Sequence, residues 1–147
     1  MTISRGIRNN NPGNIDYNAR NAWQGQLSPD PAIEKRFARF DAPENGIRAL
    51  AKLLVNYRTK TGMPGVGGPG IDTVRETINR WAPPVENSTE SYIAAVSAAA
   101  GVLPDEPINI RCPLMLPAVV TAIIRHENGS QPYSPAVIAE GVRRALV

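Results

Sequence analysis

Proline and glycine interrupt this chain so often that it can form only short regular elements. The sequence holds 14 prolines and 12 glycines among 147 residues, which exceeds their average usage. Proline ends helices and removes a backbone donor, and glycine weakens the interior of helices and strands. The pattern leaves room for several short helices and excludes a long coiled coil or a large sheet. The length suits one compact domain, which we assign to residues 1–147.

From residue 41 onward, apolar residues repeat at helical spacing between these interruptions. Caps and stops bound the repeats: Asp72 is an expected cap, Gly101 and Asn128-Gly129 are expected ends, and Ser134-Pro135 is an expected start. We predict five helices, between residues 41 and 62, 72 and 82, 87 and 101, 113 and 128, and 134 and 146. Residues 63–70, rich in glycine and proline, are expected to form a surface loop.

Residues 1–40 lack helical spacing. The run Asn-Asn-Asn-Pro-Gly-Asn at 9–14 is typical of turns, because Asn and Gly accept positive φ and Pro fixes φ. The short apolar segments around it are broken by Pro29 and Pro31, and they indicate a small two- or three-stranded sheet or a set of loops. We therefore expect a mainly α (α+β) fold, with a helical lobe in residues 41–147 and a small irregular β lobe in residues 1–40.

One cysteine and one histidine narrow the available chemistry. Cys112 cannot form an intramolecular disulfide, and with His126 as the single histidine we expect no metal site. The two residues cannot form a catalytic pair either, because they lie about 21 Å apart along one predicted helix at 1.5 Å per residue. We expect no cofactor. Acid–base chemistry in this chain must come from carboxylates.

The net charge of +3 favours an anionic partner. The basic residues are scattered and are not interleaved with aromatic ones, so we do not expect nucleic-acid binding. No apolar run approaches the ~20 residues of a membrane span, and the first residues lack the apolar core of a secretory signal. We expect a soluble monomer that does not insert stably into membranes.

Glu127 is the acidic residue whose position is least favourable for stability. Four- and seven-residue steps back reach Ile123 and Val120, so its side chain projects from the apolar side of a predicted helix. It also lies in the last turn, where desolvation and the helix terminus disfavour a charged carboxylate. A general acid needs such surroundings. The alternative is a surface acid at a frayed helix end, paired with Arg125 or His126. We assign other carboxylates to helix caps (Glu44, Glu90), exposed helix faces (Glu76, Glu140) and a loop (Asp105, Glu106).

Several segments resemble the flagellar-type peptidoglycan glucosaminidases. The segments are Asn10-Asn11-Pro12-Gly13-Asn14-Ile15, Trp23-Gln24-Gly25, Phe37-Ala38-Arg39-Phe40, the helix from Gly46 to Tyr57, and the stretch from Trp81-Ala82 through Thr89 to Tyr92. In that family the catalytic Glu-Ser-Gly ends the first helix. Here the matching Glu127-Asn128-Gly129 comes near the end of the chain, so the order of the elements looks circularly permuted.

Over most of its length the chain also resembles lysozyme-like lysins and virion-associated structural proteins of phages and prophages, including the lysin of double-stranded RNA phages. The segments that carry this resemblance are residues 8–15, Arg80-Trp81-Ala82-Pro83-Pro84 with Glu86-Asn87, and His126-Glu127-Asn128-Gly129. The resemblance implies a lysozyme-like fold. It also implies cleavage of the peptidoglycan glycan strand by a muramidase, a lytic transglycosylase or a glucosaminidase.

The resemblance also implies roles for individual residues. Glu127 would protonate the leaving glycosidic oxygen, and Tyr92 would steady the developing positive charge or orient the substrate, unless it is a core aromatic. Glu34, preferred over Asp30, is the candidate second carboxylate. If neither reaches, a single-acid transglycosylase mechanism applies. Substrate-binding positions are expected at Asn14, Trp23, Gln24, His126 and Asn128.

The implied partners are peptidoglycan glycan strands and, for a virion-associated protein, other virion components. The substrate lies outside the cytoplasmic membrane, so we expect the protein in the virion, or in the host cytoplasm before release, with its action on the cell wall in the periplasm. The alternative is a non-catalytic virion structural or glycan-binding protein that retains the lysozyme-like fold.

Overall fold

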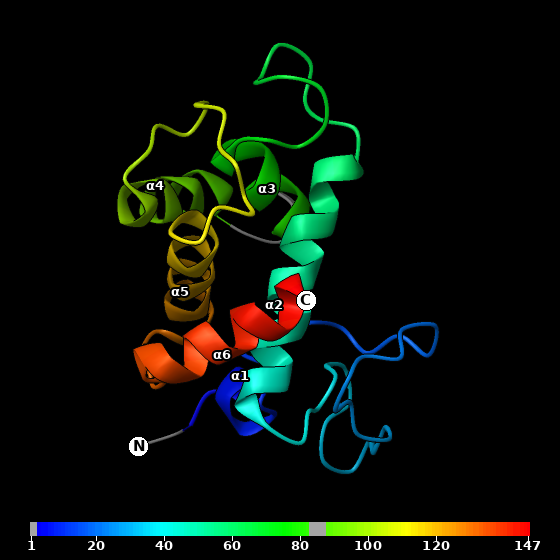
Figure 1. Cartoon of the computed structure of the whole chain (residues 1–147). Helices are drawn as coiled ribbons and strands as arrows, with labels where there is room; N and C mark the ends of the chain where they lie inside the picture. The colour runs from blue at the N-terminus through cyan, green and yellow to red at the C-terminus, as the bar shows by residue number, and fades with distance from the viewer. Residues whose placement is uncertain (1–2, 83–87) are drawn as a thin grey trace. The chain divides into compact units, whose positions relative to one another are not determined.

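The computed structural model describes residues 3–82 and 88–147. These residues form six α-helices and one 3-10 helix (Figure 1), namely α1 (Arg5–Arg8), α2 (Pro43–Asn56), η1 (Tyr57–Thr59), α3 (Val74–Trp81), α4 (Thr89–Ala100), α5 (Met115–Asn128) and α6 (Pro135–Leu146). The chain divides into two compact units. Unit 1 holds Met1–Lys52 and Ile123–Val147, and unit 2 holds Leu53–Ala122. Among the described residues, no helix is both long and apolar enough to cross a membrane.

The mainly α fold class is confirmed, and all five predicted helices are present as α2 to α6. Gly101 and Gly129 follow α4 and α5 in the left-handed conformation, with φ of +72° and +73°. Ser134 caps α6, because its Oγ accepts a hydrogen bond from Val137 N at 3.2 Å. Helix α1 is an addition to the predicted set, and the first predicted helix ends as α2 at Asn56, followed by η1, instead of continuing to residue 62. Residue 87, the expected start of the third predicted helix, lies outside the described residues, as do Pro83-Pro84 and Glu86-Asn87 of the phage-lysin resemblance.

The predicted β lobe is the main correction to the fold. Between residues 3 and 40, backbone pairing is limited to two isolated antiparallel bridges, Asp16–Phe37 and Gln26–Phe40. An asparagine side chain adds to this backbone pairing. Asn11 Nδ2 donates to the carbonyl oxygens of Ile15 at 2.9 Å and Ala38 at 2.8 Å. The Ile15 oxygen also accepts from Ala38 N at 2.9 Å, so backbone pairing and the Asn11 amide together hold the segment, which folds as a set of loops.

In unit 1, α2 and α6 approach closely because Gly141 has no side chain (Figure 1). A Cβ on Gly141 would lie 2.5 Å from Ile47 Cγ2 and 3.0 Å from the Glu44 carbonyl oxygen. Arg144 on α6 also donates to Asn45 Oδ1 on α2 at 3.1 Å. The buried apolar side chains of unit 1 come from α2, α5, α6 and the N-terminal loops: Ile15, Phe40, Ile47, Leu50, Ile123, Ile124, Ile138 and Val142.

In unit 2, α3 packs against α4. Thr73 is the N-cap of α3 in place of the predicted Asp72, because Thr73 Oγ1 accepts from Glu76 N at 3.2 Å. The assignment of Glu76 to an exposed helix face is wrong, since this residue is 2% exposed. Its carboxylate accepts from Thr73 Oγ1 at 3.0 Å and from Met63 N at 2.7 Å. A reciprocal cap therefore draws the Glu76 carboxylate inward and ties α3 to the preceding loop.

Gly46 allows the start of α2 to contact the asparagine-rich loop (residues 9–14), and substitution of Gly46 tests that contact. A Cβ at Gly46 would lie 1.8 Å from the Asn10 carbonyl oxygen. We expect Gly46→Ala to lower the free energy of unfolding by about 3 kcal/mol in urea titration. The control is Gly101→Ala, where a Cβ meets nothing within 4 Å. Its positive φ alone costs about 1 kcal/mol. Equal losses in the two variants would contradict the close approach.

Candidate active site

Glu127 lies in the last turn of α5, where an asparagine of the N-terminal loop holds its carboxylate. Asn14 Nδ2 donates a hydrogen bond to Glu127 Oε1 at 3.2 Å. The helix ends one residue later, and Gly129 N donates to the Arg125 carbonyl oxygen at 2.8 Å. Glu127 is partly exposed. The carboxylate therefore has a fixed orientation and remains accessible from solvent.

Asn14 shows two signs of constraint. Its φ of +52° lies in the left-handed region, which residues other than glycine rarely adopt. Its Oδ1 is buried and has no hydrogen-bond partner among the described residues. A buried acceptor without a partner costs about 1–3 kcal/mol. Buried polar atoms without a partner concentrate at functional sites, so the pair of Asn14 and Glu127 is the candidate site of unit 1.

The short helix α1 joins the end of α5 to the asparagine-rich loop. Ser4, the N-cap of α1, donates from Oγ to Asn128 Oδ1 at 2.6 Å. Asn128 Nδ2 in turn donates to the Pro12 carbonyl oxygen at 2.8 Å. A Cβ on Gly6 would lie 2.5 Å from Asn128 Oδ1 and 3.0 Å from Asn14 Oδ1. Because Gly6 leaves that space open, Asn14 and Asn128 can meet beside Glu127.

Glu34 is buried at the other side of α1 and accepts six hydrogen bonds. Its side chain is 1% exposed. Oε1 accepts from Arg5 Nε, Arg8 Nη2 and the Asn9 amide, and Oε2 accepts from Arg5 Nη2 and from the backbone N–H groups of Arg36 and Phe37. The Arg5 guanidinium, helped by the two N–H groups and the amide, holds the pKa of Glu34 well below its usual range.

These six hydrogen bonds limit the chemistry that the Glu34 carboxylate can perform. A carboxylate offers about four lone-pair sites, and six donors already point at this one. Neither oxygen is available to activate a water or to attack a sugar carbon. The structure therefore gives Glu34, the candidate second carboxylate, the role of an anchor. It fixes α1 and the loop that ends at Phe37.

The structure brings together three of the predicted site residues, Asn14, Glu127 and Asn128. His126 is exposed at the same helix end. Trp23 and Gln24 lie in a separate turn, in which Gln26 N donates to the Trp23 carbonyl oxygen at 3.0 Å. The Gln24 side chain is exposed, whereas Trp23 Nε1 is buried and has no partner among the described residues.

Tyr92 belongs to the apolar core of unit 2. It is 1% exposed and is the largest of the fully buried side chains. Its neighbours along α4, Ile93 and Val96, are equally buried. Of the two roles considered for Tyr92, this burial favours the core aromatic over a substrate contact.

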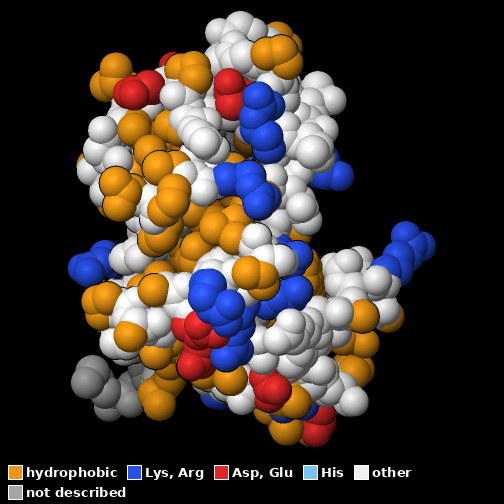
Figure 2. Space-filling view, in the orientation of Figure 1, with side chains coloured by type: hydrophobic (Ala, Val, Ile, Leu, Met, Phe, Trp, Pro, Cys, Tyr) orange, Lys and Arg blue, Asp and Glu red, His pale blue; other side chains and the backbone are white. Residues whose placement is uncertain are grey.

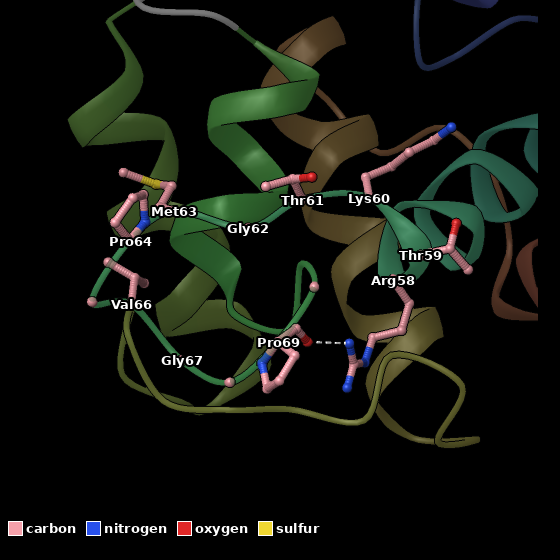
Figure 3. A pocket seen from close by; sticks show the side chains of 13 residues that line it. Arg58, Thr59, Lys60, Thr61, Gly62, Met63, Pro64, Val66, Gly67 and Pro69 are labelled. Atoms are coloured by element: carbon pink, nitrogen blue, oxygen red, sulfur yellow. Dashed lines mark hydrogen bonds between the residues drawn. The ribbon is translucent and has the colours of Figure 1, made fainter.

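Unit 2 also contains a cavity of about 660 Å³, lined by the loop from Arg58 to Gly70 (Figure 3). The charged residues of its lining are Arg58 and Lys60, and Arg58 Nη1 donates to the Pro69 carbonyl oxygen. Its lining contains no carboxylate and no histidine. The cavity therefore offers no carboxylate or imidazole group for acid–base chemistry.

Fold and site together define a mainly α protein in which a half-exposed glutamate at a helix end is oriented by an asparagine-rich loop. No family model matches the chain. A 140-residue alignment relates it to "Protein P5" of Pseudoalteromonas phage PM2, with 37% identity over 94% of this chain and 79% of the relative. The chain therefore belongs to the same family as this bacteriophage protein.

Sequence reasoning missed α1 and the anchoring role of Glu34. A local signal for α1 existed, because Ser4 is a favourable N-cap before Arg5. Arg5 and Arg8 are three residues apart and so share a helix face. Nothing local links them to Glu34, which lies 29 residues beyond Arg5. The pairing becomes visible only once the loops are folded.

The depressed pKa of Glu34 makes stability depend on pH. A carboxylate with a lowered folded-state pKa stabilises the protein above its unfolded pKa of about 4.3, and this contribution is lost as the pH falls toward the folded value. We expect Glu34→Gln to lower the free energy of unfolding by about 2–4 kcal/mol at pH 7. The difference from wild type should shrink below about pH 4.

Glu140→Gln is the matched control for this experiment. Figure 2 shows acidic and basic side chains adjoining over α6, where Glu140 pairs with Arg143 at 2.8 Å and Arg144 at 2.6 Å. Hydrogen bonds from Arg143 and then Arg144 lower the pKa of Glu140 to about 2. Because these charges face water, the loss at pH 7 should be clearly smaller than for Glu34→Gln. Equal losses in chemical denaturation would contradict the anchoring role of Glu34.

Proposed function

We propose that unit 1 cleaves the glycan strand of peptidoglycan, with Glu127 as the general acid. The observation that carries the proposal is the hydrogen bond from Asn14 to the partly exposed Glu127 carboxylate. The segment His126-Glu127-Asn128-Gly129 and the asparagine-rich loop are two of the segments that resemble muralytic enzymes. They are also the segments that meet at this carboxylate. Membership of a bacteriophage family fits a lysin or virion-associated enzyme.

The proposed reaction needs one carboxyl group. Protonated Glu127 donates its proton to the glycosidic oxygen, and the bond between that oxygen and the anomeric carbon breaks. The resulting carboxylate then takes a proton from a hydroxyl of the same sugar, and the hydroxyl oxygen bonds to the anomeric carbon to close an anhydro ring. Charge and atoms balance, no metal or cofactor takes part, and Glu127 returns to its acid form. This route is preferred because Glu34 is saturated with donors.

A water molecule in place of the sugar hydroxyl would make the same site a hydrolase. The two routes leave different products, which mass spectrometry of the digested wall distinguishes. Anhydro-muramyl ends indicate a lytic transglycosylase, reducing muramyl ends a muramidase, and reducing glucosaminyl ends a glucosaminidase. We expect anhydro-muramyl ends.

Substitution of the acid tests the proposal. We expect purified wild-type protein to clear a peptidoglycan suspension and Glu127→Gln to reduce the rate at least about 100-fold, as loss of a general acid does. Glu106→Gln, a substitution at an exposed loop carboxylate, is the control and should retain the wild-type rate. Clearing that survives in Glu127→Gln would remove the role of Glu127. Clearing by neither protein would favour the non-catalytic virion or glycan-binding alternative.

The role of Asn14 is tested by a pair of asparagines with the same backbone conformation. Asn14 and Asn10 both have φ of +52°, so replacement by glycine preserves the turn at either position. Asn10 Nδ2 donates to the Phe40 carbonyl oxygen, away from Glu127. We expect Asn14→Gly to slow clearing about tenfold or more, and Asn10→Gly to change thermal stability without slowing clearing. Equal rates for the two variants would contradict an orienting role for Asn14.

A further inference from the structure

We propose that Arg5 and Arg8 on α1 form a subsite for a carboxylate of the wall polymer. The inference rests on the proposed function, and it names the part of the substrate that this surface recognises. Both arginines lie on α1 and donate hydrogen bonds to the same buried carboxylate, that of Glu34. Their side chains are 51% and 50% exposed, although one face of each is bound. The pair is therefore held by the protein and open to a ligand.

Each guanidinium has N–H donors that do not bond to Glu34. A guanidinium has five N–H groups in a rigid fork. Arg5 uses Nε and Nη2 on Glu34, and Arg8 uses Nη2. The Nη1 group of Arg5 and the Nε and Nη1 groups of Arg8 make no hydrogen bond to the described residues. A planar oxyanion can therefore bind these forks without displacing Glu34.

The position of Arg5 is fixed by an aromatic ring as well as by Glu34. Its guanidinium carbon lies 4.5 Å from the centre of the Phe37 ring, and that of Arg36 lies 5.0 Å from the same ring. Such stacking reduces the conformational entropy that a ligand would otherwise have to remove. Subsites built on preorganised groups bind more tightly than the same charges on free side chains.

The charges in this region favour an anion. The ion pairs of this region join three cationic side chains, those of Arg5, Arg8 and Arg36, to two carboxylates, those of Glu34 and Asp16. The excess among these side chains is one positive charge. Glu34 is buried, so its negative charge does not face an incoming ligand. The exposed part of the cluster is therefore more positive than its net charge suggests.

The subsite adjoins the candidate site through α1. Ser4 bonds to Asn128, and the next residue, Arg5, bonds to Glu34, although their Cα atoms are only about 3.8 Å apart. Asn128, the residue after Glu127, therefore binds the N-cap of the helix that carries both arginines. Peptidoglycan carries carboxylates on the peptides that substitute its glycan strand. Guanidinium groups recognise such planar oxyanions in a bidentate manner, which an uncharged glycan cannot satisfy.

Binding, measured without turnover, tests the subsite. The probes are a soluble disaccharide-peptide fragment of peptidoglycan and the same fragment with its carboxyl groups converted to amides. With Glu127→Gln protein in calorimetry, we expect the amidated fragment to bind at least about tenfold more weakly. Adding Arg8→Gln should weaken binding of the free-acid fragment by a similar factor and leave binding of the amidated one unchanged. Arg20→Gln, at an exposed arginine of the same unit, is the control and should change neither.

A second measurement does not depend on how well the arginine variants fold. In NMR spectra of the Glu127→Gln protein, the Nε–H signals of Arg5 and Arg8 should shift with the free-acid fragment and stay in place with the amidated one. Equal affinity for the two fragments, or unshifted signals, would overturn the subsite. Tighter binding of a DNA duplex through Arg8 would also overturn it, by assigning the surface to nucleic acid. Fragment binding by a wild-type protein that never clears the wall would overturn the proposed function alone.

Discussion

The arrangement of unit 1 depends on one buried carboxylate. Glu34 accepts hydrogen bonds from α1, from the Asn9 amide and from the backbone at Arg36 and Phe37. A helix of four residues has no stability of its own, because helix nucleation costs more than so few bonds return. Helix α1 exists because Glu34 holds its arginines and Asn128 binds its N-cap. The orientation of the α5 terminus relative to the loop follows from that attachment.

Asparagine side chains bond to backbone groups in the N-terminal loops, as a neighbouring strand does in a sheet. The Asn11 amide bonds to two buried carbonyl oxygens and its Oδ1 accepts from Ile15 N at 3.0 Å, so both ends of the side chain act as backbone substitutes. Asn10 and Asn14 accept the left-handed conformation that the tight turns require. A loop held in this way can keep one side-chain amide in a fixed orientation. Asn14 aims its amide at Glu127.

The helices could be predicted well from the sequence and the contacts between distant residues poorly, and the reason is physical. Apolar spacing, caps and stop residues are local, so α2 to α6 could be predicted from neighbouring residues. The β lobe was wrong and the alternative of a set of loops was right, because short apolar segments cannot show that an asparagine will bond to the backbone carbonyl groups between them. Asn14 and Glu127, 113 residues apart, were each singled out on separate grounds, but their contact was not predictable. The burial of Glu76 and the saturation of Glu34 likewise depend on donors supplied by distant loops.

The two glutamates of unit 1 occupy opposite environments, and this contrast bears on the chemistry. A group that alternates between acid and carboxylate cannot be held by two guanidinium groups, because they stabilise one of its two forms too strongly. Glu34 is held in that way, by Arg5 and Arg8, and its charge is permanent at neutral pH. Glu127 instead receives a hydrogen bond from a neutral amide and is open to solvent. An amide can orient either form of the carboxyl group, since its donor suits the carboxylate and its acceptor suits the acid. The Oδ1 atom of Asn14 is buried and unpaired among the described residues, and it is the acceptor that suits the acid form.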